Sequence, residues 1–357
     1  MRSHHLRAAA GDSAIDLATA HYDSPFITVY KFSSGFVSKY SDPSTLIAGS
    51  GIDVDFSPDG TTLAIAHVNS PYVSAYSWTI GSGFGSKYAD PTTTPIGNCL
   101  GISFNPAGTA LGVAQYNSYG LVVYKWSSSG FGTKYSDPSS LPSSGFGIAW
   151  SPDGTAVAVG SVYHPYINVY PFDFNTGIGT RYSNPSTLPP GRTRGVAFSP
   201  DGSDIAMGHY NSPFISAYSW TSGSGFGTKY SDPSTLPGYD GAGVAFSPDG
   251  SDIALGRDNT PQVTVYPWNS GFGTKYSDPS TVTYNGWSVD FSPDGANIAI
   301  GNDSNPVITV YPWTSGSGFG TKYADPSTMP PNSVRGVAFS PACLLYTSDA
   351  ADDVLCV

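Results

Sequence analysis

A repeat of 45 to 48 residues constrains the fold of this chain more than any other feature of its sequence. Each copy carries an anchor in which an aromatic residue precedes Ser-Pro-Asp-Gly, once in the variant form FNPAG and once cut short as FSPA. The anchors begin at Phe56, Phe104, Trp150, Phe198, Phe246, Phe291 and Phe339. A fixed period of this length marks repeat architectures, so the chain is an array of supersecondary units.

One copy, residues 194–237, predicts four short strands. Its Ser-Pro-Asp-Gly segment, residues 199–202, is a hairpin turn, because proline presets φ and glycine accepts the positive φ that follows. We expect strands over residues 195–198, 204–209, 214–220 and 226–230. Four antiparallel strands in about 40 to 50 residues make the blade of a β-propeller, in which neighbouring blades bury each other's faces.

The unit resembles the blade of WD-repeat propellers. The resemblance rests on V-A-F-S-P-D-G, then I-A-x-G, then a strand that ends in aromatic residues, and it covers nearly all of residues 15–342. It implies a ring of four-stranded blades. The chain departs from that family because it lacks the Gly-His and Trp-Asp pairs. It carries tyrosine at the tryptophan position of the third strand, at Tyr30, Tyr76, Tyr124, Tyr170, Tyr218, Tyr266 and Tyr311.

The two ends of the array predict how the ring closes. From Ile15 the sequence begins with a second strand, whereas residues 335–341 (RGVAFSP) are a first strand without a successor. Seven first strands and seven sets of the other three strands make seven blades if the last strand pairs with the first set. The resemblance implies the same overlapping closure. We therefore predict an all-β, seven-bladed propeller over residues 13–342, forming one domain and a monomeric ring.

Both termini fall outside the repeat. Residues 1–12 show no apolar central run, so we expect an unstructured leader and no signal peptide. Residues 343–357 break the pattern where Asp-Gly should follow. The segment CLLYTSDAADD within them is similar to a translated DNA-library adapter, so we interpret the tail as non-native and expect the natural protein to continue. Cys99 is then the only cysteine of the propeller, which leaves no framework disulfide.

Composition excludes several classes of partner. The net charge of −11 with only 15 lysines and arginines argues against nucleic acid, whose phosphates require clustered cations. No apolar run approaches the roughly 20 residues of a membrane helix. All acidic residues are aspartate, and glycine and proline are abundant, which favours tight turns over helices. We expect no cofactor and no metal ion.

Comparing the copies separates the constant frame from the parts that vary. The fourth strand always carries a basic residue, a tyrosine and then Asp-Pro or Asn-Pro, which we interpret as a soluble outer edge. Two positions vary. The strand-one column lies four residues before each anchor and contains Ile52, Leu100, Phe146, Arg194, Ala242, Trp287 and Arg335. The strand-two column ends the second strand and contains His21, His67, Gln115, Ser161, His209, Arg257 and Asn302.

Both columns are predicted to lie on one face of the ring, because the first strand starts where the second ends. Varied polar and aromatic tips on a constant frame are typical of a binding surface. We expect three pairs to contact a ligand: Arg194 with His209, Trp287 with Asn302, and Arg335 with His21. The remaining candidate ligand-binding residues are His67, Arg257, Tyr239 and Tyr284.

The function predicted from these features is a non-catalytic scaffold that binds a protein or a glycan. The near identity of the copies resembles repetitive surface or virion proteins of microbes and phages, which implies an extracellular or tail-associated adhesin. The alternative is a propeller hydrolase or lactonase on the same face. Asp23, Asp240, Asp258 and Asp303 would then supply acid and base, and Arg257 would stabilise charge.

Overall fold

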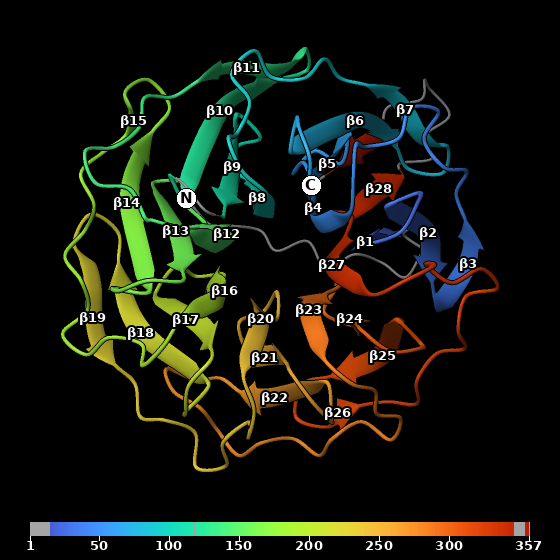
Figure 1. The fold of residues 1–357 in the computed structure, drawn as a ribbon. Coiled ribbons are helices and arrows are strands. Elements are labelled where there is room, and N and C mark those ends of the chain that lie inside the picture. Colours follow the sequence, from blue (N-terminus) through green and yellow to red (C-terminus); the bar gives the residue numbers. More distant parts are fainter. Residues whose placement is uncertain (1–14, 117–118, 346–353, 357) are drawn as a thin grey trace.

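The computed structural model describes residues 15–116, 119–345 and 354–356. In these residues the chain forms seven antiparallel β-sheets arranged as blades around a central axis, with the first strand of each blade innermost (Figure 1). The predicted seven-bladed propeller is therefore confirmed. The predicted leader, residues 1–12, lies outside the described residues.

The first blade contains β27 (Val334–Phe339), β1 (Ile15–His21), β2 (Ile27–Ser33) and β3 (Gly35–Lys39). The second contains β4 (Gly51–Phe56), β5 (Thr62–His67), β6 (Val73–Thr79) and β7 (Gly83–Lys87). The third contains β8 (Cys99–Phe104), β9 (Ala110–Gln115), β10 (Leu121–Ser127) and β11 (Gly130–Lys134). The fourth contains β12 (Gly145–Trp150), β13 (Ala156–Ser161), β14 (Ile167–Asp173) and β15 (Gly177–Ile178).

The fifth blade contains β16 (Thr193–Phe198), β17 (Asp204–His209), β18 (Ile215–Thr221) and β19 (Gly225–Lys229). The sixth contains β20 (Gly241–Phe246), β21 (Asp252–Arg257) and β22 (Val263–Pro267). The seventh contains β23 (Gly286–Phe291), β24 (Asn297–Asn302), β25 (Ile308–Thr314) and β26 (Gly318–Phe319). Outside the ring, β28 (Cys343–Leu345) pairs with β29 (Val354–Cys356).

Strand β27 closes the ring by pairing with β1, as the sequence predicted. Its register places Phe339 opposite Leu17 and Gly336 opposite Ala20. At the end of the strand, the Asp16 N–H donates to the Ser340 hydroxyl over 2.8 Å, and the Ser340 N–H donates to the Asp16 carbonyl over 2.8 Å. The last first strand therefore completes the blade that the N-terminal strands begin.

The hydrophobic core lies between neighbouring blades. The cluster between the first two blades combines Ile27 and Val29 with Phe56, Leu63 and Trp78. The centroids of the Tyr40 and Trp78 rings lie 5.0 Å apart in an edge-to-face contact, and similar aromatic contacts recur around the ring. Because each blade needs both neighbours to bury its faces, closure matters to the stability of the whole ring.

The tyrosines at the WD-type tryptophan position are buried and make one repeated hydrogen bond. Tyr76 donates its hydroxyl to the Thr45 carbonyl over 2.7 Å, in the connection from the preceding blade. The same bond is made by Tyr30, Tyr124, Tyr170, Tyr218, Tyr266 and Tyr311. The tyrosines therefore attach each blade to the connection that leads into it.

The fourth strand is short or missing in three blades, all of which carry proline in the third strand. Strands β15 and β26 have two residues each, and the sixth blade has only an isolated bridge between Trp268 and Phe272. Pro171, Pro312 and Pro267 stand in β14, β25 and β22, where the other blades have lysine or serine and a five-residue fourth strand. Proline has no N–H, so the hydrogen-bond ladder to the outer strand is interrupted.

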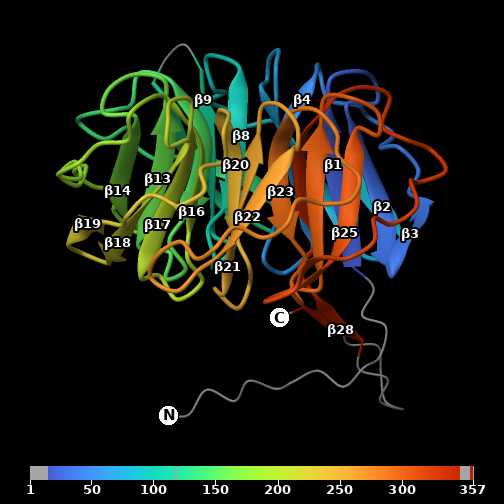
Figure 2. The ribbon, with the colours of Figure 1, turned by 90° about the horizontal axis from the view of Figure 1, so that it is seen from below.

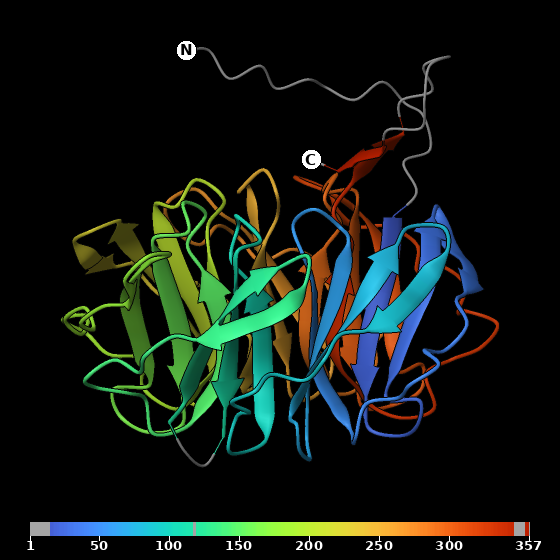
Figure 3. The same cartoon turned by 90° about the horizontal axis from the view of Figure 1, so that it is seen from above.

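The two faces of the disc differ. The Ser-Pro-Asp-Gly turns lie at the end of each first strand, on the face from which β28 protrudes (Figures 2 and 3). The starts of the first strands lie on the opposite face. At the rim, six blades carry a lysine in the fourth strand or at the equivalent position of the repeat, and it pairs with the aspartate three residues later, for example Lys229 with Asp232. No helix in the described part of the chain is long and apolar enough to cross a membrane.

Candidate functional site

The strand-one column lines the mouth of a central channel. Six of its members (Ile52, Leu100, Phe146, Arg194, Trp287 and Arg335) border a cavity of about 670 Å³ enclosed by the seven inner strands. The strand pairing confirms that the two variable columns lie at the same end of the blades, because Thr193 pairs with His209 and Gly286 with Asn302. One face therefore carries the channel mouth and the loops around it.

The strand-two column lies inside the blades, which corrects the expectation that its side chains project from this face. His21, His67, His209 and Asn302 have no exposed surface, and Arg257 is 5% exposed. The imidazole Nε2 atoms of the three histidines lie 2.9–3.0 Å from the hydroxyl oxygens of a serine or threonine seven residues later. These side chains join the second strand to the third. We therefore leave this column out of the proposed site.

Burial also changes the proton affinity of these histidines. It lowers the pKa of His21 and His209 to about 4, although backbone carbonyl acceptors partly oppose this. Arg257 is similarly engaged, because its Nε donates to the Pro261 carbonyl over 2.6 Å. None of the three predicted pairs presents both of its side chains to a ligand, because one member of each pair is buried inside a blade: His209, Asn302 and His21.

Arg194, Trp287 and Arg335 come together instead across three blades. The guanidinium carbon of Arg194 lies 4.5 Å from the centroid of the Trp287 ring, and that of Arg335 lies 3.8 Å from it. We call these three residues the arginine clamp. A guanidinium over an indole face is attracted by the electron density of the ring. The indole therefore holds two positive groups near one another at the channel mouth.

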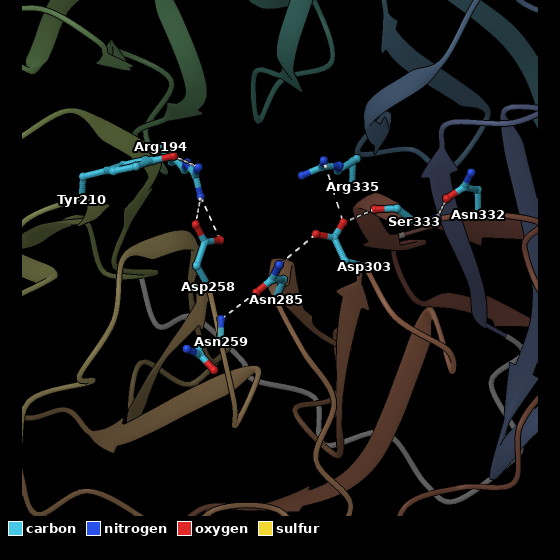
Figure 4. Close-up of polar contacts among 9 residues, drawn as sticks. All are labelled: Arg194, Tyr210, Asp258, Asn259, Asn285, Asp303, Asn332, Ser333 and Arg335. Carbon is cyan, nitrogen blue, oxygen red and sulfur yellow. Dashed lines mark hydrogen bonds and ion pairs between the residues drawn. The ribbon is translucent and has the colours of Figure 1, made fainter.

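Each arginine of the clamp is oriented by a carboxylate. Nη1 of Arg194 lies 3.0 Å from both carboxylate oxygens of Asp258, and Nη2 donates to the Tyr210 hydroxyl (Figure 4). The side chain of Arg194 is 14% exposed. Burial lowers its pKa, which the charge of Asp258 opposes. The guanidinium is held in place and still reaches the channel.

Arg335 has a looser partner, Asp303, at 3.8 Å. Asp303 also accepts hydrogen bonds from Ser333 and, over 3.0 Å, from the Asn285 amide (Figure 4). Burial alone would raise the pKa of Asp303, but these two hydrogen bonds and the charge of Arg335 together lower it. Asp303 is therefore a fixed negative charge that positions Arg335.

The other two predicted carboxylates of this face, Asp23 and Asp240, do not form an ion pair with an arginine of the clamp as Asp258 and Asp303 do. Asp23 accepts a hydrogen bond from the Asn332 amide over 2.9 Å. Burial and the neighbouring charge of Asp258 raise the pKa of Asp240. Tyr239 and Tyr284 are 47% and 59% exposed, so these predicted residues do form the outer tips of the face.

Three carboxylates inside the channel were missed by the sequence analysis. Asp53 and Asp55 on β4 and Asp290 on β23 border the same cavity as the clamp. Each accepts a backbone N–H from a neighbouring blade, from Ile102, Phe104 and Phe339 respectively, over 2.7–3.0 Å. The sequence could have indicated these carboxylates, because the other copies have glycine, alanine or serine at the same positions of the repeat.

Burial raises the pKa of Asp53 and of Asp290 to about 7, and that of Asp55 to about 8, although the backbone N–H groups oppose this shift. The charge of Asp53 further raises the pKa of the other two. At neutral pH each of the three carboxyl groups is therefore protonated for part of the time. Among the described residues, no group of three His, Cys or Asp side chains is arranged to hold a metal ion.

These shifts predict that the folded chain loses stability as the pH rises from 6.5 to 8. The native state binds more protons than the unfolded state between about pH 4 and 8, because the three carboxyl groups titrate later when folded, so stability falls as the pH rises. The buried histidines act oppositely, because in the unfolded chain they still bind protons near their usual pKa of about 6.5, but this effect fades by about pH 7.5 and is smaller than that of the three carboxyl groups. Thermal melts at pH 6.5, 7.3 and 8 should show a falling Tm.

An Asp55→Asn variant should show a smaller decrease in Tm over this range. A decrease equal to that of the unaltered chain would contradict the assignment to these carboxylates. Asp232→Asn, at the exposed rim, is the matched control and should leave the slope unchanged.

Comparison with known proteins shows the fold. No protein-family model matches the chain, and no curated protein matches it in sequence. A candidate 6-phosphogluconolactonase from Bacteroides fragilis is similar in structure, with a TM-score of 0.72 and 15% identity over 93% of this chain and 99% of that one. A periplasmic gluconolactonase from Pseudomonas aeruginosa has a TM-score of 0.71 and 16% identity, over 92% and 100%.

The fold also occurs with different chemistry. Hydrazine synthase from Kuenenia stuttgartiensis has a TM-score of 0.58 and 16% identity over 80% of this chain and 88% of that one. The chain is thus a seven-bladed propeller structurally like lactonases. The expected resemblance to WD-repeat propellers is confirmed for the four-stranded blade and the ring that the blades form.

Proposed function

We propose that this chain binds a small organic anion at the channel mouth and hydrolyses a lactone ring in that molecule. The observation that carries the proposal is the arginine clamp, in which two guanidinium groups contact one indole ring above a cavity of about 670 Å³. Guanidinium groups match the planar, two-oxygen geometry of carboxylates and phosphates. A cavity of this volume suits a ligand of the size of a sugar acid.

The same arrangement provides the groups that ester hydrolysis needs. Attack of water on a lactone carbonyl requires a base for the proton and positive charge near the developing oxyanion. Arg335 offers that charge, since its partner Asp303 is 3.8 Å away and neutralises it incompletely. The channel wall below carries carboxylates. The structural likeness to gluconolactonases supports the choice of lactones as the first substrates to test.

The test is hydrolysis of a panel of five- and six-membered aldonolactones, with and without a carboxylate or phosphate group, followed by acid release at constant pH. We expect rates above spontaneous hydrolysis, with preference for the anionic lactones. Arg194→Ala should lower kcat/KM at least about tenfold, because it removes a charge-assisted contact to the anion.

Lys229→Ala is the matched control, since it removes one positive charge at the outer rim, where Lys229 pairs with Asp232. It should retain full activity. If no lactone in the panel is hydrolysed faster than in buffer alone, the proposed hydrolase activity is wrong.

A second candidate function is recognition of a glycan without catalysis. Tyr239 and Tyr284 project from loops on the same face and are 47% and 59% exposed, and exposed tyrosines suit stacking against sugar rings. Binding of neutral oligosaccharides without any lactone hydrolysis, lost in a Tyr284→Ala variant, would favour this function.

A further inference from the structure

The three channel carboxylates lie on the two inner strands that flank β27. Its neighbours on the inside of the ring are β4, which carries Asp53 and Asp55, and β23, which carries Asp290. Gly336 of β27 lies beside Asp53, since a Cβ added to Gly336 would be 2.7 Å from the Asp53 Cα and 2.9 Å from Oδ1. Gly336 follows Arg335 directly. Asp53 is therefore one residue below the clamp.

Asp55 and Asp290 lie one level deeper. They occupy equivalent positions in their repeats, each one residue before the anchor aromatic, as Ala338 does in β27. Asp290 accepts the Phe339 N–H over 2.8 Å and Asp55 accepts the Phe104 N–H over 2.7 Å. Of the three carboxylates, Asp53 thus lies nearest to the mouth, and the other two lie beneath it.

The fold by itself does not require these carboxylates. Five copies have glycine at the position of Asp53, and one has serine: Gly101, Gly147, Gly195, Gly243, Gly336 and Ser288. Their strands form the same inner wall without a carboxylate there. A hydrogen bond to the adjacent strand is therefore an insufficient reason for three half-buried acids on the same side of the channel. Among the described residues, no salt bridge neutralises any of the three.

We infer that Asp53 is the general base of the proposed lactone hydrolysis, with Asp55 and Asp290 as positioning residues beneath it. This inference rests on the proposed function. As water attacks the lactone carbonyl carbon, one water proton passes to the Asp53 carboxylate, and the carbonyl oxygen becomes an oxyanion that faces the Arg335 guanidinium. The bond from carbonyl carbon to ring oxygen then breaks, and Asp53 returns the proton to the leaving ring oxygen. The product is the open hydroxy acid.

The raised proton affinity of this sector fits that role. A base acts best when its pKa lies near the working pH, and burial places the pKa of Asp53 at about 7. Among the described residues that border the cavity, Asp55 and Asp290 are the other carboxyl groups, and Tyr22, Arg194 and Arg335 are the remaining titratable groups. Protons held by the two deeper acids limit the negative charge that Asp53 experiences.

The test compares Asp53→Asn with the unaltered chain on a six-membered aldonolactone. We expect kcat to fall at least about 100-fold, with KM changed less than about threefold, because only proton transfer is removed. The rise of kcat with pH around pH 7 should disappear. Asp53→Gly, which copies the residue of five other repeats, gives the same test if the asparagine variant does not fold.

Ser288→Ala is the control, because Ser288 occupies the equivalent position on β23. It should keep kcat and its pH profile. If the unaltered chain hydrolyses lactones and Asp53→Gly or Asp53→Asn retains more than half of kcat with the same pH profile, the assignment of Asp53 is wrong while the proposed function stands. If the unaltered chain hydrolyses none, both are overturned.

Discussion

Removal of residues 334–357 is expected to abolish cooperative folding of the propeller. The truncation deletes β27, which carries the buried residues Val334, Val337 and Phe339 and pairs with β1 along its length. Burying three such side chains stabilises a protein by about 5–9 kcal/mol, which is comparable to the total stability of about 5–15 kcal/mol typical of domains. The loss also exposes the edge of β1 and the facing sides of β4 and β23.

Removal of residues 343–357 alone is the matched control. It deletes only β28, β29 and the segment interpreted as non-native, and it leaves β27 paired. Circular dichroism melts and size-exclusion chromatography should show a cooperative, compact monomer for this control and an aggregated or non-cooperative chain for the longer deletion. Equal Tm values for the two would show that closure by β27 is dispensable.

Asp252→Ala is expected to destabilise the ring by about 3–5 kcal/mol. The buried Asp252 carboxylate accepts the Tyr276 hydroxyl over 2.7 Å and the Trp313 Nε1–H, from the next blade, over 3.0 Å. Each buried donor left without a partner costs about 1–3 kcal/mol. The same node, in which one carboxylate accepts a tyrosine hydroxyl and the tryptophan Nε1–H of the next blade, occurs at Asp16 and Asp204. Urea unfolding followed by tryptophan fluorescence measures the change.

The chain contains a control for this node. The equivalent position in the fourth blade is Ala156, and the Nε1–H of Trp220 in the fifth blade is buried without a partner. Trp313→Phe should therefore destabilise the ring more than Trp220→Phe, by about 1 kcal/mol, which is the net worth of one hydrogen bond. Equal losses would mean that ring packing, and not the carboxylate, joins these blades.

The architecture could be predicted because its evidence is local and repeated. Each Ser-Pro-Asp-Gly turn specifies one hairpin, and Gly60, for example, has the positive φ of 68° that such a turn requires. The unpaired first strand at residues 335–341 could fill only one position, since only the N-terminal blade lacked a first strand. Proline in three third strands was also visible in the sequence, yet its effect on the outer strand was not anticipated, because ladder hydrogen bonds depend on which edge faces the partner.

The candidate site was predicted in part. Variation among copies pointed to Arg194, Trp287 and Arg335, which do meet at the channel mouth. The same reasoning selected His21, His67 and His209, which are internal. The serine or threonine seven residues after each histidine could have indicated a buried hydrogen bond, since a hydroxyl can satisfy an imidazole nitrogen.

The amino-acid sequence alone determined the number of blades, the turn that starts each of them and the strand that closes the ring, because these depend on neighbours in the chain and on a period. Which residues meet across blades was decided only by the tertiary structure. Trp287 lies 93 residues after Arg194 and 48 before Arg335 in the sequence, and Asp53 reaches the same channel from the other end of the chain. Ring closure brings them together, since a channel exists only when all inner strands surround one axis.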